Sequence, residues 1–343
     1  MTATAKPLII SAPEPRTIDL LFQPDRKAEL FDRYEILEVP ERQVNGLDAE
    51  VLRRTRYILG QPPLNLETLE RMESLRCIFN VESNLLNNMP YDYLFQTGVH
   101  VVTTGAVFAQ PVAEMGLAMA LNLARDVIDA DVAFRDGEEL WGGDGNANAR
   151  LLTGSKIGII GFGDLGRALA EVLSGFRADI AVYDPWLPAS MLEEAGVRSA
   201  SLNEVLETSE TVFVVAAVTS ENKGFLDAKA FASMRRGAAF ILLSRADVVD
   251  FDDLMDAVAS GHILAASDVF PQEPLAVDHP VRRLKGFVRS AHRAGALDIA
   301  FKRMGDMVLD DMDLLDRGLP PMRCKRAERE TVSRMRSAPA TKN

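Results

Sequence analysis

The chain has 343 residues, of which 47% are hydrophobic and 26% are charged, with a formal net charge of −12. This length and composition are typical of a globular protein with two domains, each burying its own core. The acidic balance argues against a nucleic-acid partner, because phosphate backbones are bound by clustered Lys and Arg. Cys77 and Cys324 have no CxxC or Cys/His spacing, so we expect no disulfide framework, no metal site and a reduced, cytoplasmic location.

The N-terminal part alternates short apolar runs with helical patterns. Apolar runs at 57–59, 77–79 and 99–102 are typical of strands, and 66–75 has the spacing of a helix. This alternation predicts a small α/β domain. The apolar run 7–10 leads directly into a Pro-rich segment, and no later segment approaches the roughly 18 apolar residues of a membrane span, so we expect no membrane partner.

From Pro111 to about Arg135 the apolar residues recur at helical spacing, with a proline in the first turn. The spacing predicts one long helix that connects two domains.

Residues 155–184 read SKIGIIGFGDLGRALAEVLSGFRADIAVYD and have the pattern of a βαβ unit that binds a dinucleotide. Gly161 would form the turn from strand to helix, Gly163 would let the backbone approach a pyrophosphate, and Gly166 would let the helix pack closely on the strand. Asp164 and Leu165 would begin the helix, whose free N–H groups and dipole favour an anion.

Asp184, at the end of the second strand, indicates which dinucleotide binds. Its carboxylate can accept two hydrogen bonds from an adenosine ribose but would repel a 2′-phosphate. The next three residues, 185–187, supply no cation to relieve this repulsion. The sequence therefore predicts NAD rather than NADP as the cofactor.

Beyond Asp184 the alternation of strands and helices continues, and it predicts a doubly wound parallel sheet of six strands. Further strands are expected at 211–218, 238–243 and 263–266, with helices at 202–207, 228–234, 251–260 and 297–315. The C-terminal segment 322–343 carries seven basic and two acidic residues without an apolar period, which predicts a frayed, solvated terminus or else an interaction arm.

Three chemically useful residues follow apolar runs of this sheet: Arg245, Glu273 and His292. Ligands of doubly wound sheets bind at the carboxyl ends of the strands, so these residues are candidates for catalysis. Taken singly, each has a structural alternative: a surface charge, a turn residue or a core histidine.

The chain resembles the D-isomer-specific 2-hydroxyacid dehydrogenases from about Leu75 to Pro320. The resemblance rests on PVAE at 111–114, GFGDLG at 161–166, YDP at 183–185, SRADVVD at 244–250, DVFPQEP at 268–274 and AHRAG at 291–295. It implies an α/β fold of two Rossmann-like domains. A doubly wound NAD-binding domain would cover 109–296, and a smaller, flavodoxin-like substrate domain would combine 1–108 with 297–343. It also implies a homodimer with its active site in the cleft between the domains.

In this family the residues that match Arg245, Glu273 and His292 are the catalytic set. Hydride transfer to a 2-keto acid places charge on the carbonyl oxygen and requires a proton there, which a histidine supplies near neutral pH. Glu273 would favour the protonated ring, and Arg245 would pair with the substrate carboxylate and polarise the carbonyl. The resemblance implies an NAD-dependent interconversion of a D-2-hydroxy acid and its 2-keto acid.

Further roles come only from matching positions in the family. Thr219, Ser244, Asp268 and Gly295 would contact the cofactor, and Asp268 matches a residue that holds the nicotinamide amide; its alternative is a helix or turn cap. Trp141 resembles a tryptophan that reaches the partner subunit's substrate site, and packing in a core or an interface is its alternative.

The largest departure from the family lies in the substrate loop. Relatives have a glycine-containing turn there, whereas this chain reads NVESNLLNN at 80–88, and Val81, Glu82 and Ser83 would face the substrate. Glu82 would repel an anionic substrate unless it faces solvent, pairs with Arg245 or accepts a hydrogen bond from a substrate hydroxyl or amine. The last alternative favours a polyhydroxylated acid, such as one derived from a sugar.

Two other functions stay open. One is oxidation of another small anion, such as phosphite or formate, although formate-type relatives carry Gln in place of Glu273. The other is a dinucleotide-sensing regulator, because the family includes corepressors that keep the same three residues.

Overall fold

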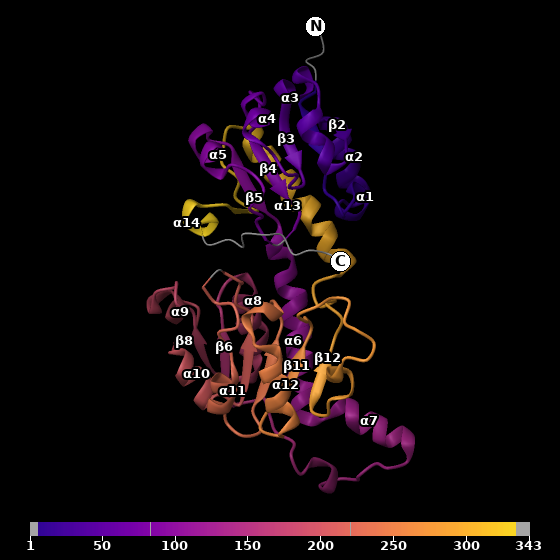
Figure 1. Ribbon diagram of the computed structural model, residues 1–343, viewed down its shortest axis with the longest axis vertical. Coiled ribbons are helices and arrows are strands. Elements are labelled where there is room, and N and C mark those ends of the chain that lie inside the picture. The colour runs from indigo at the N-terminus through magenta and orange to yellow at the C-terminus, as the bar shows by residue number, and fades with distance from the viewer. Residues whose placement is uncertain (1–5, 83, 220, 334–343) are drawn as a thin grey trace. The chain divides into compact units, whose positions relative to one another are not determined.

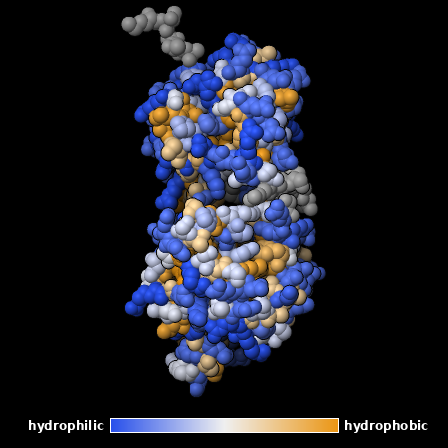
Figure 2. All heavy atoms as spheres, turned by 90° about the vertical axis from the view of Figure 1, so that its left-hand side faces the viewer, coloured by the Kyte–Doolittle hydropathy of each residue, from blue (hydrophilic) through white to orange (hydrophobic). Residues whose placement is uncertain are grey.

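The computed structural model describes residues 6–82, 84–219 and 221–333. They form two compact units, one running to Phe108 and resuming at Ala296, the other containing Ala109–Gly295. Each unit is built on its own sheet with helices packed against it (Figure 1), so the expected α/β class is confirmed. On the face shown in Figure 2, polar residues predominate and hydrophobic residues gather only in small patches.

The first unit has a six-stranded sheet in the order β13-β5-β4-β3-β1-β2. All pairings are parallel except that of β13 with β5. The order 2-1-3-4-5 of its parallel strands is that of flavodoxin-like folds. The strands are β1 (Leu8–Ser11), β2 (Glu35–Glu38), β3 (Thr55–Leu59), β4 (Cys77–Asn80), β5 (His100–Thr103) and β13 (Lys325–Arg326).

Helices cover both faces of this sheet because its strands alternate their side chains between two cores. Tyr57 and Phe79 belong to the core under α1, α2 and α13, whereas Ile58 and Ile78 belong to the core under α3, α4 and α5. The helices are α1 (Ile18–Leu21), α2 (Pro24–Arg33), α3 (Ala49–Arg54), α4 (Leu66–Glu70), α5 (Tyr91–Thr97), α13 (Asp298–Asp316) and α14 (Arg329–Val332), with 3₁₀ turns η1 (Glu41–Gly46) and η2 (Gly105–Phe108).

The C-terminal segment is anchored by a buried carboxylate. Asp311 of α13 is fully buried, and its two oxygens accept the backbone N–H groups of Met322, Arg323 and Cys324 at 2.7–2.8 Å. The segment then pairs as β13 with β5. The expectation of a frayed terminus is therefore wrong for 322–333. This segment has no apolar face to hold it in place, and the contacts with Asp311 and β5 that hold it instead leave no periodic pattern in the sequence. Residues 334–343 lie outside the described part.

The second unit has a parallel sheet of seven strands in the order β12-β11-β10-β9-β6-β7-β8. The strand that the sequence did not predict is β8, whose two exposed residues are too short for a periodic signal. The strand order reverses between β6 and β9, where such folds bind their ligands. The strands are β6 (Lys156–Ile160), β7 (Asp179–Tyr183), β8 (Arg198–Ser199), β9 (Thr211–Val214), β10 (Ala239–Leu242), β11 (Leu264–Ser267) and β12 (Phe287–Arg289).

Most helices of this unit lie close to the predicted ranges, but α9 (Ala189–Glu194) was not predicted and the range 111–135 is divided between two helices. The helices are α6 (Ala109–Arg125), α7 (Val127–Asp136), α8 (Asp164–Leu173), α9 (Ala189–Glu194), α10 (Leu202–Thr208), α11 (Ala228–Ser233) and α12 (Phe251–Ala259), with 3₁₀ turns η3 (Asp144–Asn146), η4 (Ser174–Phe176), η5 (Ala246–Val248) and η6 (Pro280–Arg283). The single helix expected at 111–135 is wrong, because Asp126 has a φ of 54° and separates α6 from α7. Apolar spacing continues across this break and hides it. Helix α7 buries none of its residues and extends away from the sheet of its unit (Figure 1).

One helical segment, Gly105–Arg125, is long and apolar enough to cross a membrane by length and composition alone. The expectation that no segment approaches a membrane span is therefore wrong on those criteria. Half of this stretch is buried inside the protein, and a Cβ added at Gly116 would lie 2.6 Å from Leu243 and 3.7 Å from Leu169. In the part from Ala109, this close packing is that of a core helix.

Candidate active site

Two glycines of the GFGDLG turn, Gly161 and Gly166, are required by its geometry. Gly161 has a φ of +94°, and an added Cβ would lie 2.5 Å from the Cα of Ala216. A Cβ on Gly166 would lie 2.4 Å from the carbonyl oxygen of Gly161, so α8 packs closely on the turn. A Cβ on Gly163, by contrast, would meet no described atom within 4 Å. The open space beside Gly163 and the uncapped first turn of α8, which begins with Asp164 and Leu165, fit a pyrophosphate.

Asp184 links the end of β7 to this turn. Its Oδ2 accepts the N–H of Phe162 at 2.8 Å, and its Oδ1 accepts the N–H of Trp186 at 3.0 Å. Sequence reasoning assigned to Asp184 only the recognition of ribose. Each carboxylate oxygen has a further lone pair, so Asp184 can hold the turn and still accept a ribose hydroxyl.

The candidate acid and its partner form a short hydrogen bond. Nδ1 of His292 lies 2.6 Å from Oε2 of Glu273, and Oε1 of Glu273 accepts the N–H of Phe270 at 2.9 Å. The carboxylate is thus oriented by the backbone, and it in turn orients the imidazole. The His292 and Glu273 side chains are 44% and 34% exposed, so the pair is accessible to a small molecule.

Asp268 holds the backbone around His292. Its Oδ1 and Oδ2 accept the N–H groups of Arg293 and Ala294 at 3.0 and 2.9 Å, and its carbonyl oxygen accepts the N–H of His292 at 2.7 Å. His292 itself has a φ of 50°, a left-handed conformation that costs a non-glycine residue energy and is common at functional sites. Asp268 therefore acts as a turn cap, the alternative that the sequence left open for it.

The parallel sheet explains why these residues meet. Arg245, Asp268 and His292 follow β10, β11 and β12, three neighbouring strands whose last residues lie in register. Their side chains therefore belong to the same carboxyl edge of the sheet. Nη1 of Arg245 donates to the carbonyl oxygen of Ser244 at 2.7 Å.

The remaining predicted cofactor residues lie along the same edge or in its loops. Thr219 follows β9, and its N–H donates to the side chain of Asn222 at 2.8 Å. Ser244 is buried, and its hydroxyl has no hydrogen-bond partner among the described residues. Gly295 closes the unit. Trp141 is 73% exposed and contacts Phe134 edge-on at 6.3 Å, so core packing is excluded for it within the chain.

The substrate loop of the first unit has a partner that sequence reasoning missed. Glu82 forms an ion pair with Arg16, with Oε2 and Nη2 at 2.9 Å, and the carbonyl oxygen of the buried Val81 accepts from Nε of the same arginine at 2.9 Å. Ser83, the third predicted residue, lies outside the described part. Arg16 precedes α1 and belongs to no motif, so no signal in the sequence pointed to it.

A hollow of about 380 Å³ lies at the carboxyl edge of the first sheet, lined by Glu14, Pro40, Glu41, Arg42 and Pro63. Burial, reinforced by the charges of Glu14 and Glu82, raises the pKa of Glu41 from 4.5 to about 7. Carboxylates therefore concentrate at this edge of the first sheet.

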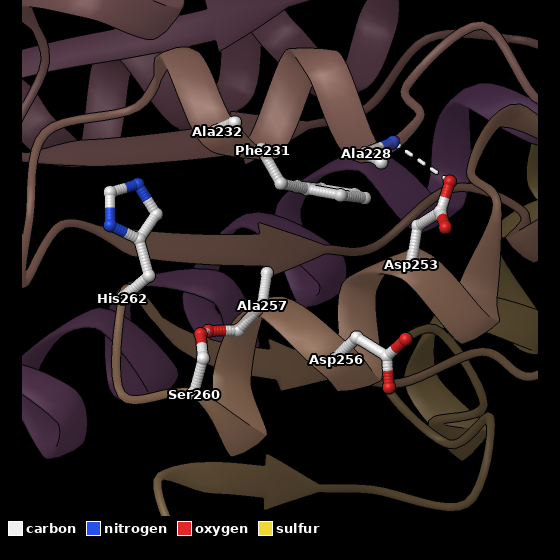
Figure 3. A pocket seen from close by; sticks show the side chains of 8 residues that line it. All are labelled: Ala228, Phe231, Ala232, Asp253, Asp256, Ala257, Ser260 and His262. Carbon is white, nitrogen blue, oxygen red and sulfur yellow. Dashed lines mark hydrogen bonds between the residues drawn. The ribbon is translucent and has the colours of Figure 1, made fainter.

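A second hollow, of about 330 Å³, lies between α11 and α12 and is shown in Figure 3. His262 stands at one side of it and Asp253, whose Oδ2 accepts the N–H of Ala228 at 2.8 Å, at the other. None of the predicted site residues lines it. We therefore do not assign the active site to this hollow.

Comparison with known proteins agrees with this geometry. The model of the D-isomer specific 2-hydroxyacid dehydrogenase, NAD binding domain, matches residues 117–294. The chain belongs to this family. The second unit is accordingly an NAD-binding domain, which confirms the predicted cofactor.

The chain spans different shares of the length of its relatives in this family. A glyoxylate reductase of Korarchaeum cryptofilum is 30% identical over 264 residues, 76% of this chain and 79% of that protein. A D-3-phosphoglycerate dehydrogenase of Mycobacterium leprae is 29% identical over 67% of this chain, which spans only 43% of that protein. The crystal structure of a phosphoglycerate oxidoreductase from Rhizobium etli is 70% identical, with a TM-score of 0.89, covering 94% of this chain and 99% of that one.

Proposed function

We propose that this chain interconverts a D-2-hydroxy acid and its 2-keto acid with NAD. The observation that carries the proposal is the 2.6 Å pair of His292 and Glu273, at the carboxyl edge that also bears Arg245. When bound, the nicotinamide supplies or accepts the hydride. The side chains of the protein then have to bind the substrate and to transfer the proton.

Three side chains would share this task. The guanidinium of Arg245 offers forked donors to the substrate carboxylate and polarises the adjacent carbonyl. His292, with Nδ1 on Glu273, keeps Nε2 for the proton that the carbonyl oxygen needs. Glu273 holds the imidazole in position through its hydrogen bond to Nδ1. In the oxidative direction the same nitrogen receives the proton.

The cofactor contacts form the second part of the proposal. Gly163 and the first turn of α8 would bind the pyrophosphate, and Asp184 would bind the adenosine ribose and exclude a 2′-phosphate. Thr219, Ser244, Asp268 and Gly295 would complete the site. For Asp268 this contact adds to its observed role as the cap of the His292 turn.

A homodimer and a cytoplasmic location also belong to the proposal. Helix α7 and the segment after it expose large hydrophobic side chains, which is typical of an unpartnered interface. They are Val127, Ile128, Val132, Phe134, Leu140, Trp141 and Leu151. We infer that a second copy of the chain covers them, and that Trp141 lies at or near the partner's substrate.

Turnover with NADH on a panel of 2-keto acids tests the function. Replacing His292 with Gln is expected to lower turnover by on the order of 10² while the Kd for NADH stays within about twofold. His262→Gln is the matched control, since its ring lies at the hollow of Figure 3. Full activity of His292→Gln would exclude it as the proton donor. Tight NADH binding without turnover of any 2-keto acid would instead identify a dinucleotide-sensing regulator. Turnover of phosphite would identify an oxidoreductase for a different anion.

A further inference from the structure

The loop that carries Glu273 has little apolar burial to hold it. Residues 271–280 are exposed except for Leu275 and His279, which are partly buried, and Val277 is 92% exposed. Leu275 packs against the core of the second unit. Burial of apolar area therefore stabilises this stretch only weakly, although its carboxylate binds the candidate acid. Polar contacts supply the remaining restraint.

Arg282 makes such contacts with the backbone just after Glu273. Its Nε donates to the carbonyl oxygen of Ala276 and its Nη2 to that of Leu275, both at 2.7 Å. A planar guanidinium presents its donors in a fixed fork, so two bonds to adjacent carbonyls restrain both distance and direction. Leu275 and Ala276 are the second and third residues after Glu273. Arg282 therefore restrains the backbone next to this carboxylate.

Arg282 is itself held by the strand that leads to His292. It belongs to the 3₁₀ turn η6, whose Val281 is fully buried. The guanidinium of Arg289, the last residue of β12, donates to the carbonyl oxygens of Val281 within this turn and of Leu284 at its end. Arg289 precedes His292 by three residues. The turn that carries Arg282 is therefore fixed to the strand before the candidate acid.

Together these contacts surround the acid and its partner with restraints. Glu273 and His292 are joined directly by the 2.6 Å hydrogen bond, and the N–H of Phe270 orients the carboxylate from the N-terminal side. On the C-terminal side, Arg282 and Arg289 connect the loop after Glu273 back to β12. Loss of these two arginines would leave the loop restrained on one side, so the distance from the carboxylate to Nδ1 could vary.

We propose that Arg282, supported by Arg289, is a positioning residue that keeps Glu273 on Nδ1 of His292. The inference deepens the proposed function and rests on it where turnover is concerned. A carboxylate accepts hydrogen bonds and cannot donate them, so Glu273 fixes the neutral imidazole in the form that carries its proton on Nδ1. Nε2 is then the nitrogen that gives a proton to the substrate oxygen or receives one from it.

The position of the imidazole proton gives the first test. Arg282→Met removes the guanidinium donors and keeps an unbranched side chain at an exposed position. Long-range nitrogen–proton NMR of the full-length protein with NADH, at a pH where the ring is neutral, should find the native proton on Nδ1 of His292. In Arg282→Met it should move toward Nε2, the site that an unrestrained histidine prefers. The His292→Gln spectrum assigns the signal.

Arg283→Met is the matched control for this variant. Arg283 lies in the same turn and is exposed, and its side chain forms no hydrogen bond or ion pair with the residues that the structure describes. The control removes the same charge from the same turn, so it should leave the proton on Nδ1 and kcat unchanged.

Turnover of 2-keto acids with NADH gives the second test. The kcat of Arg282→Met should fall about tenfold, because small misplacements of a proton donor cost rate, while KM and the Kd for NADH stay within about twofold. Arg282→Lys keeps the charge but not the fork, so it should recover only part of kcat. Arg289→Met should act in the same direction, and the double variant should cost less than the two single changes combined, since both arginines act in one chain of contacts.

Three results would overturn the inference: a native proton position in Arg282→Met, a kcat of this variant within about twofold of the Arg283→Met value, or a native ring that carries its proton on Nε2. If the native protein reduces no 2-keto acid, the proposed function fails, but the NMR comparison still decides whether Arg282 holds Glu273 on His292. Should Arg289→Met not fold, the Arg282 variants alone decide.

Discussion

Replacing Asp268 with Asn should both destabilise the NAD-binding domain and disturb the candidate acid. The native carboxylate is 2% exposed and accepts two backbone N–H groups, from Arg293 and Ala294. Asn has nearly the same shape but only one acceptor oxygen. Its NH₂ group would face the second N–H, so one hydrogen bond is lost and a buried donor stays unsatisfied.

The magnitude follows from these two losses. A hydrogen bond to a charged group contributes about 1.5–3 kcal/mol, and an unsatisfied buried donor costs about 1–3 kcal/mol. Removing a buried charge offsets part of this cost, because the charge no longer has to be desolvated. We therefore expect a loss of about 2–3 kcal/mol in the free energy of unfolding, or a fall in Tm of roughly 4–12 °C for a domain of this size.

Calorimetry and hydrogen exchange measure the effect. The fall in Tm should be accompanied by faster hydrogen exchange of the Arg293 and Ala294 amides. The kcat should also fall, because the left-handed backbone at His292 is no longer held in place. Asp253→Asn is the control, since Asp253 accepts one N–H, from Ala228, at an exposed position. An unchanged transition with unchanged exchange at both amides would show that the carboxylate does not hold this turn.

Three further predictions concern other parts of the molecule. Burial and neighbouring carboxylates raise the pKa of Glu41 from 4.5 to about 7. Between these two pH values the folded protein binds more protons than the unfolded chain, so its free energy of unfolding should fall as the pH rises from 4.5 to about 7. Glu41→Gln should remove this contribution and, after allowance for solvent screening, gain about 1 kcal/mol at pH 8 but nothing at pH 4 in urea unfolding; equal gains at both values would contradict the assignment. Gly166→Ala should abolish measurable NADH binding by calorimetry, because its Cβ would lie 2.4 Å from the carbonyl oxygen of Gly161, and native affinity would disprove the close packing. Asp184→Ala should weaken NADH binding and narrow an at least tenfold preference over NADPH, and a native protein without that preference would refute the ribose argument.

Local sequence determined the parts of this protein whose interactions are local. The turn at 161–166 and both flanking strands were predictable because the glycine positions, the buried run and the acidic strand end lie within 30 residues. The glycine positions reflect steric requirements, which the structure shows at Gly161 and Gly166. The candidate residues Arg245 and His292 were predictable from the rule that parallel strands end at one edge, together with the family resemblance. Short strands such as β8 left no periodic signal.

Tertiary structure alone decided the contacts between residues far apart in the chain. The pairing of Arg16 with Glu82, the anchoring of the C-terminal segment by Asp311 and the cap that Asp268 places on the His292 turn join positions separated by 66, 11–13 and 25–26 residues. Each is a polar side chain that satisfies partners brought near by the packed sheets. These partners meet only once the chain has folded, so neither residue type nor spacing could identify them. Hydrophobic periodicity and glycine position, by contrast, act over a few residues and can be recognised in the sequence alone.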